Sequence, residues 1–338
     1  MTGRYVIVGA GAVGSTAAAQ LHLAGFEVVL AARGRHLDAL RARGLTYVRP
    51  EGTRTLALPA VAGPDEVSLR DGDVLVFATK SQDTEAALQD WAWAPVDGGR
   101  REAATALPAL MMQNGIDNER AALRRFERVY GCVVTVPATF LHPGEVVARA
   151  DLPGAFWLGR YPNGRDATRD RLAADLRTAG FAVQVVDDVV PWKVGKLLVN
   201  LHNGADALFA PSPRRDDLIR ALREEATRVL RAAGIEAVNR TAASTLDLAG
   251  LEHQVTGSPD RPAEEWKHSS TWQSLTRTGS VESDFLNGEI VLLARLHGTS
   301  APLNAALQRL VATAPRQAIR PGGLDDADLA RLFPLGSA

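Results

Sequence analysis

Three glycines near the N-terminus have the spacing of a phosphate-binding turn. Gly9, Gly11 and Gly14 follow an apolar strand over residues 5–8 and open an alanine-rich helix. In such a turn the first glycine permits a tight bend, the second lets the backbone approach a pyrophosphate, and the third lets the helix pack on the strand. The helix N-terminus attracts the phosphates through its free N–H groups and its dipole. We therefore predict dinucleotide contacts from the whole turn, namely Gly9, Ala10, Gly11, Ala12, Val13 and Gly14.

The end of the next predicted strand indicates which dinucleotide binds. A helix over 15–23, closed by Gly25, and a strand over 26–30 follow the turn, and this context favours a ligand site over a purely structural turn. NAD-binding versions place an acidic residue about 20 residues beyond the glycines, for the ribose 2′-hydroxyl. Here Arg33 and Arg35 stand at that end, and a guanidinium pairs with a 2′-phosphate that a carboxylate would repel. The sequence predicts NADP(H), with a solvated arginine as the alternative.

A second set of polar residues interrupts an apolar helix in the C-terminal half. At about 100° per residue, Lys196, Asn200 and Asn203 share one face of this helix. Such a face either meets solvent or lines a cleft, because burying it without polar partners is costly. An ammonium aimed at a reacting carbonyl oxygen can stabilise the developing negative charge and donate a proton. Lys193 lies on the same side of the helix and is a rival for this role.

Alternating strands and helices must position these residues. Strands are predicted over 73–78, 109–112, 129–136 and 182–186, and helices from near residue 83 and over 168–178. The ranges 145–150 and 155–158 are predicted to pair with each other as short strands. This alternation predicts a mostly parallel sheet, which binds ligands at the carboxyl ends of its strands. Arg33, Lys80 and Asn114 all stand at such ends.

From about residue 190 onward, the apolar periodicity is that of helices only. Helices are predicted over 192–208, 216–233, 239–249, 281–297 and 303–313. We therefore expect an α/β fold in which an N-terminal dinucleotide-binding domain of the Rossmann type precedes an all-helical domain. The predicted domains are residues 1–189 and 190–314, followed by a poorly ordered C-terminal extension, residues 315–338.

Composition excludes several classes of protein. The chain has 338 residues, of which 46% are hydrophobic, enough to bury the cores of two domains. Its net charge of −1 gives no broad attraction to nucleic acid or to an anionic membrane. No leader precedes the first strand and no apolar run approaches about 18 residues, so a cytoplasmic protein without a membrane partner is predicted. Cys132 is predicted to be a core thiol, and the histidines lack metal-ligand spacing, so no metal site is predicted.

Taken together, these features resemble the ketopantoate reductase (2-dehydropantoate 2-reductase) family, up to about residue 313. The resemblance rests on the glycine turn, Arg33, Lys80, Asn114-Gly115, Lys196 with Asn200, Ser269-Ser270, and the motif Glu282-x-Asp284-x-x-Asn287-Gly288. It implies that a 2-oxo acid is reduced by NADPH in the cleft between a Rossmann domain and a helical domain. Ketopantoate, reduced to pantoate for pantothenate biosynthesis, is the first choice of substrate. A homodimer stays open.

The resemblance also implies roles for individual residues. Lys196 resembles the general acid, and Glu282 matches a catalytic position near the cofactor. Asn200 and Ser270 match substrate-binding positions, and Asn114 matches one that touches both ligands. Lys80 is counted with Arg33 among the cofactor-binding residues, and Asn203 with the substrate-binding ones.

Two departures from the family pattern concern the substrate pocket. The family's second asparagine comes four residues after the first and precedes a proline, whereas Asn203-Gly204 comes after three. Trp272 and Gln273 also follow Ser270 where other residue types are common. A different 2-oxo substrate therefore stays open. So do an imine, as in opine-type dehydrogenases, and a polyketide-like or otherwise specialised ketone. A non-catalytic NADPH sensor is the alternative of another class, and it would not need Lys196 and Glu282 together.

Overall fold

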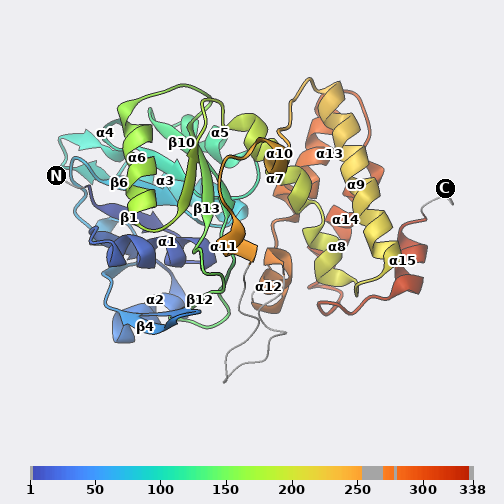
Figure 1. The fold of residues 1–338 in the computed structure, drawn as a ribbon, viewed down its shortest axis with the longest axis horizontal. Helices are drawn as coiled ribbons and strands as arrows, with labels where there is room; N and C mark the ends of the chain where they lie inside the picture. The colour runs from blue at the N-terminus through green and yellow to red at the C-terminus, as the bar shows by residue number, and fades with distance from the viewer. Residues whose placement is uncertain (1–2, 253–268, 278–279, 335–338) are drawn as a thin grey trace. The chain divides into compact units, whose positions relative to one another are not determined.

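The computed structural model describes residues 3–252, 269–277 and 280–334 (Figure 1). The chain divides into two compact units. The first unit consists of the residues up to Lys193 and of a later segment that begins at Thr241. The second unit consists of Val194–Arg240 and of the C-terminal residues that follow the later segment of the first unit. The division thus falls at Lys193 rather than at residue 189, and residues 241–252, predicted as part of the helical domain, belong to the first unit.

The first unit is built on an eight-stranded sheet of order β14-β13-β10-β9-β6-β1-β2-β5. Its strands are β1 Tyr5–Val8, β2 Val28–Ala31, β5 Ala60–Val61, β6 Val74–Phe77, β9 Ala109–Met111, β10 Val129–Thr135, β13 Ala155–Arg160 and β14 Ala182–Val185. All neighbours pair in parallel except β10 and β13. The central strands are buried along their whole length, as a sheet covered on both faces requires. The predicted α/β, mostly parallel fold is confirmed.

Helices connect the parallel strands of this sheet. They are α1 Ala12–Leu23, α2 Gly34–Arg43, α3 Ser81–Ala92, α4 Ala103–Ala106, α5 Asn118–Leu123 and α6 Ala167–Thr178. The first begins directly at the glycine turn, with Gly11 as its N-cap residue. A small hairpin of β7 (Pro95–Val96) and β8 (Arg101–Glu102) follows α3.

A second sheet corrects the predicted pairing of the two short strands. It consists of β11 Ala138–Thr139, β12 Glu145–Ala148, β3 Leu45–Arg49 and β4 Gly52–Leu56, in that order. The range 145–150 therefore pairs with β3 and β11, whereas 155–158 lies in the main sheet between β10 and β14. Alternating apolar residues reveal a strand but not its partner, because pairing depends on chain segments far apart in the sequence.

The second unit is helical, as predicted, with different boundaries. After α7 (Val190–Asn200) it contains α8 Asn203–Leu208, α9 Pro213–Ala232, α12 Ser270–Arg277, α13 Asn287–Leu296, α14 Pro302–Thr313 and α15 Asp326–Leu332, and the short 3₁₀ turn Ser283–Phe285. Helices α9, α13 and α14 pack side by side (Figure 1). The predicted helix 192–208 is broken between α7 and α8, and 239–249 contains only the single turn α10 (Arg240–Ala243), followed by α11 (Ala249–Glu252).

The described part of the C-terminal extension packs on the helical unit, contrary to the expectation of poor order. Asp325 caps α15 by accepting hydrogen bonds from the N–H groups of Ala327 and Asp328, both at 2.9 Å. Leu329 and Phe333 are buried, and the Phe333 ring contacts Phe209 edge-to-face. The residues Pro321-Gly322-Gly323 led us to expect poor order, but a short helix with buried apolar residues, α15, follows them. Within the described ranges, no helix is long and apolar enough to cross a bilayer.

Candidate cofactor and substrate sites

The three glycines of the turn have three different surroundings. Gly9 has φ +106°, and a Cβ there would lie 2.6 Å from the backbone nitrogen of Thr79, after β6. A Cβ on Gly14 would lie 2.0 Å from the carbonyl oxygen of Gly9. Around Gly11 nothing in the described structure lies within 4 Å of such an atom. Gly9 and Gly14 are thus needed for packing, whereas Gly11 leaves open space at the N-terminus of α1, which fits a bound pyrophosphate.

His36, which was not among the predicted site residues, supports the glycine turn through two hydrogen bonds. The backbone N–H of Gly144 donates to His36 Nδ1 at 2.9 Å, so the proton of the neutral ring is on Nε2. Nε2 then donates to the carbonyl oxygen of Ala10 at 2.8 Å. The ring also contacts Phe140. No local pattern marks His36, because both of its hydrogen-bond partners are distant in sequence.

Arg33 is the N-cap residue of α2, directly after β2. Arg33 and Arg35 are both exposed, and neither guanidinium forms a hydrogen bond or an ion pair with another described residue. A guanidinium at this place has its donors available for a phosphate. The arrangement fits the predicted role of Arg33 at an adenosine ribose 2′-phosphate.

Lys80 and Asn114 follow two paired strands, β6 and β9, and a buried network joins their surroundings. Asn118 Nδ2 donates to the carbonyl oxygen of Asn114 at 2.8 Å and to Ser81 Oγ at 3.2 Å. Thr84 Oγ1 donates to Asn118 Oδ1 at 2.9 Å. Asn118, Ser81 and Thr84 are all buried, so the ends of the two strands are held at fixed positions.

Gln113 extends this network across the sheet. Its Nε2 lies 2.9 Å from the carbonyl oxygen of Thr79 and 2.6 Å from Thr84 Oγ1. The residue is buried two positions after the end of β9, directly before Asn114. The loops that carry Lys80 and Asn114 are therefore tied to each other by side-chain amides, which sequence spacing alone did not indicate.

Lys193, the rival lysine, is buried in the first unit. It forms an ion pair with Glu119, and its Nζ also donates to the carbonyl oxygen of Gln113 at 3.0 Å. Burial raises the pKa of the Glu119 carboxyl, and the Lys193 ammonium opposes that shift. Cys132 is buried nearby in β10, and burial raises the pKa of its thiol, which confirms the predicted core thiol.

Lys196 stands on α7 one turn before Asn200, and both belong to the second unit. Lys196 is half-buried, and its Nζ forms no hydrogen bond or ion pair with a residue of the described ranges. Burial, together with the positive charge of Arg240, lowers the pKa of Lys196 to about 8. Asn200 is buried. The structure therefore provides a partly desolvated ammonium one helical turn before a buried amide.

Asn203 lies on a different helix from Lys196, so the predicted common face is wrong for this residue. The helix breaks after Asn200, and Asn203 begins α8, where it is buried. Ser269 Oγ donates to the carbonyl oxygen of Asn203 at 3.3 Å, which brings Ser270, the first residue of α12, to the start of α8. Gly204 faces α14, and a Cβ there would lie 2.8 Å from Val311 Cγ2. Packing therefore leaves no room for an asparagine at position 204.

The motif around Glu282 contains both candidate site residues and structural ones. Glu282 is buried directly before the turn Ser283–Phe285. Asn287 Nδ2 donates to the carbonyl oxygen of Leu201 at 3.3 Å and to Asn304 Oδ1 at 2.9 Å. The first bond ties the start of α13 to the break between α7 and α8, and the second ties it to α14. Asn287 thus stabilises the segment that carries Asn200 and Asn203.

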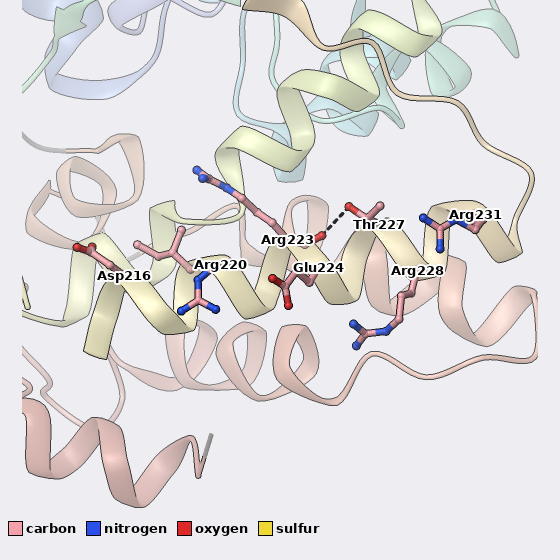
Figure 2. Close-up of a pocket in the computed structure, with 8 residues that line it drawn as sticks. Asp216, Arg220, Arg223, Glu224, Thr227, Arg228 and Arg231 are labelled. Carbon is pink, nitrogen blue, oxygen red and sulfur yellow. Dashed lines mark hydrogen bonds between the residues drawn. The ribbon is translucent and has the colours of Figure 1, made fainter. Parts of the chain in front are cut away.

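A hollow along α9 contains none of the predicted site residues (Figure 2). It is lined by Asp216, Ile219, Arg220, Arg223, Glu224, Thr227, Arg228 and Arg231. Arg223 donates to the carbonyl oxygens of Leu198 and Val199 at 3.3 and 3.4 Å, and Thr227 Oγ1 donates to the carbonyl oxygen of Arg223 at 2.8 Å. These bonds give Arg223 and Thr227 structural roles on the helix surface.

A Rossmann-type unit with an open glycine turn, joined to a helical unit with a partly desolvated lysine, defines a dinucleotide-dependent oxidoreductase. The chain belongs to the ketopantoate reductase PanE/ApbA family: the N-terminal family model matches residues 5–163 and the C-terminal model matches residues 191–314. The resemblance stated from the sequence is confirmed. Enzymes of this family act on a keto group with a nicotinamide dinucleotide.

Individual relatives agree with this membership. A 2-dehydropantoate 2-reductase from Pyrococcus horikoshii is 28% identical over 314 residues, which cover 91% of this chain and 96% of that protein. The structure of a PanE/ApbA family ketopantoate reductase from Ralstonia eutropha JMP134 is 27% identical, has a TM-score of 0.73 and covers 93% of this chain and 99% of its own. D-mandelate dehydrogenase with NADH and anilino(oxo)acetate is 22% identical with a TM-score of 0.76 over the same shares, a likeness of fold alone.

Proposed function

We propose that this protein reduces a 2-oxo acid to the 2-hydroxy acid with NADPH, and that ketopantoate is the first substrate to test. The observation that carries the proposal is the half-buried Lys196 ammonium, without a partner among the described residues, one helical turn before Asn200. The names of the relatives, 2-dehydropantoate 2-reductases, support the substrate class.

Lys196 is proposed as the general acid. A nicotinamide dinucleotide held at the glycine turn would supply the hydride for the keto carbon of the substrate. Negative charge then develops on the keto oxygen, where the Lys196 ammonium stabilises it and donates its proton. With a pKa of about 8, the side chain is mainly protonated at neutral pH and gives up its proton more readily than an exposed lysine. Glu282, which forms no ion pair with Lys196 in the described structure, is proposed to contact the nicotinamide ribose or to hold the ammonium in place once the ligands are bound.

Asn200, Asn203 and Ser270 are proposed to bind the substrate. Their amide and hydroxyl groups are donors suited to a carboxylate and to a hydroxyl group. The bond between Ser269 and the Asn203 carbonyl keeps the start of α12 at the start of α8. Asn203 therefore contributes from a helix of its own rather than from the face that carries Lys196.

NADPH is proposed to bind at the glycine turn, with further contacts from Arg33, Lys80 and Asn114. The space around Gly11 within the described structure fits the pyrophosphate. The Arg33 guanidinium, which pairs with no other residue of the described ranges, fits a 2′-phosphate. The hydrogen bonds of Asn118 and Gln113 would hold the two strand ends in place during binding.

One observation favours a 2-oxo acid other than ketopantoate. The position four residues after Asn200 is Gly204, and its contact with α14 excludes the asparagine typical of the family. Because Asn203 stands one position earlier than the family's second asparagine, its amide would lie at a different place in the substrate pocket. Such a pocket would favour a 2-oxo acid with a substituent other than that of ketopantoate.

A screen of NADPH oxidation across 2-oxo acids, with ketopantoate included, tests the proposal. The expected result is turnover of at least one 2-oxo acid, lost on replacement of Lys196. Turnover of neutral ketones or imines alone, or no turnover of any carbonyl compound, would overturn it.

A further inference from the structure

A carboxyl group from a neighbouring helix caps the start of α14. Glu225, on α9, is buried, and its carboxyl group accepts hydrogen bonds from the N–H groups of Leu303 and Asn304, at 3.1 and 2.9 Å. The first N–H groups of a helix have no acceptor within the helix itself, and a carboxylate suits the positive end of the helix dipole. Because the acceptor stands on another helix, the first turn of α14 is held at a fixed place on α9.

The side chain of Asn304 continues this contact toward α13. Its Nδ2 donates to Glu225 Oε1 at 3.0 Å and to the carbonyl oxygen of Leu222 at 3.1 Å. The amide nitrogen has two protons, so both are used and the orientation of the amide is fixed. Oδ1 then accepts from Asn287 Nδ2 at 2.9 Å. Asn304 is fully buried, so water does not compete for these bonds.

The last link reaches the break between α7 and α8. Asn287, buried at the start of α13, also donates through Nδ2 to the carbonyl oxygen of Leu201 at 3.3 Å. Leu201 directly follows Asn200 and lies two residues before Asn203. Buried polar side chains on α9, α14 and α13 (Figure 1) are thus connected in one line to the backbone between the two asparagines.

The break between α7 and α8 gives this line of hydrogen bonds a role beyond packing. Along one continuous helix, the backbone hydrogen bonds would fix the relative positions of Asn200 and Asn203. Here the two residues belong to different helices, so the positions of their amides depend also on how the intervening backbone is held. Apolar contacts would keep the helices together without a preferred direction, whereas a hydrogen bond to the Leu201 carbonyl specifies where it lies.

We propose that Asn304 is a positioning residue for the substrate-binding asparagines. Held by Glu225, it fixes Asn287, and Asn287 in turn sets the backbone at the break between α7 and α8. The amides of Asn200 and Asn203 are thereby kept at the places from which they bind the substrate. This inference rests on the proposed function, in which both asparagines bind a 2-oxo acid, and adds a residue that determines how well that acid is bound.

The first test compares Asn304→Ala with wild type on a 2-oxo acid that the wild type reduces. We expect KM to rise at least about tenfold, kcat to stay within about threefold and the Kd for NADPH to stay unchanged, because only the substrate-binding amides move. Leu329→Ala is the matched control: Leu329 is buried in the same unit, on α15, and its replacement lowers stability without breaking the line of hydrogen bonds. An unchanged KM in Asn304→Ala, or an equal rise in Leu329→Ala, would overturn the inference.

The second test asks whether Asn304 acts through the two asparagines, which a merely structural role would not require. Asn304→Ala is introduced into the variant Asn200→Ala/Asn203→Ala, and kcat/KM is measured for wild type and all three variants. If Asn304 acts through these amides, its replacement should lower kcat/KM by less than about threefold once they are gone. A loss of about tenfold in that background as well would show independent action and contradict the inference.

The two proposals fail in different ways. If the wild type reduces no 2-oxo acid, the proposed function fails and this inference falls with it. If the wild type reduces 2-oxo acids but Asn304→Ala leaves KM unchanged, only the role of Asn304 is wrong. Should Asn304→Ala fail to fold, Asn287→Ala decides, because it removes the link to Leu201 and leaves the bonds of Glu225 to α14 in place. A wild-type KM in Asn287→Ala then shows that the line of hydrogen bonds does not position the asparagines.

Discussion

Lys193 is paired with Glu119 in the interior of the α/β unit. The side chains are 3% and 0% exposed, and Lys193 also donates to the carbonyl oxygen of Gln113 at 3.0 Å. The lysine therefore anchors the start of α7 beneath the end of β9. Lys196, less than one turn further on, has no such partner among the described residues. This difference supports Lys196 rather than Lys193 as the proton donor.

Replacement of Lys196 should remove an interaction that grows in the transition state. Lys196→Met keeps an unbranched side chain one atom shorter than that of lysine, but removes the charge and the proton. We expect kcat to fall by roughly 10² or more, with NADPH binding unchanged in a fluorescence titration. A variant that retains most of its kcat would show that the ammonium has no chemical role.

Replacement of Lys193 should act on stability. Lys193→Met leaves the Glu119 carboxyl buried without its partner, which should lower the free energy of unfolding by about 3–5 kcal/mol in urea titrations. The folded variant should keep kcat within a few-fold. The double variant Lys193→Met/Glu119→Gln is the matched control and should recover much of the loss. If the single variant is the one that loses kcat, the roles of the two lysines are reversed.

Cofactor selection should depend on Arg33. Wild type should bind NADPH more than tenfold more tightly than NADH, which corresponds to more than about 1.4 kcal/mol. Arg33→Ala should weaken NADPH far more than NADH, because only the former has the 2′-phosphate. Dissociation constants for both cofactors measure this, and equal losses would mean that Arg33 does not contact the 2′-phosphate.

The glycine turn offers a matched pair of substitutions. Gly14→Ala should lower the free energy of unfolding by about 1–3 kcal/mol or more, because its Cβ would meet the Gly9 carbonyl oxygen at 2.0 Å. Gly11→Ala meets open space and should change stability by less than about 1 kcal/mol. It should instead weaken dinucleotide binding at least tenfold, because the methyl group would occupy the proposed pyrophosphate space. Unaltered binding by Gly11→Ala would place the phosphates elsewhere.

The sequence by itself determined the features that depend on neighbours along the chain. The strand before Gly9, the turn, the start of α1 and the arginine after β2 form one continuous segment, so residue type and spacing suffice to predict them. The same holds for the alternation of strands and helices, and for the change to helices near residue 190. Family membership followed from several such segments taken together.

Only the tertiary structure decided which distant residues meet. Glu119 is paired with Lys193, His36 with Ala10, and the Val238 carbonyl lies against Gly195, in each case across many intervening residues. The partner of β12 and the break before Asn203 were mispredicted for the same reason. Periodicity reports which face of a segment is apolar, whereas strand pairing, helix breaks and the partners of buried charges depend on what packs against that face.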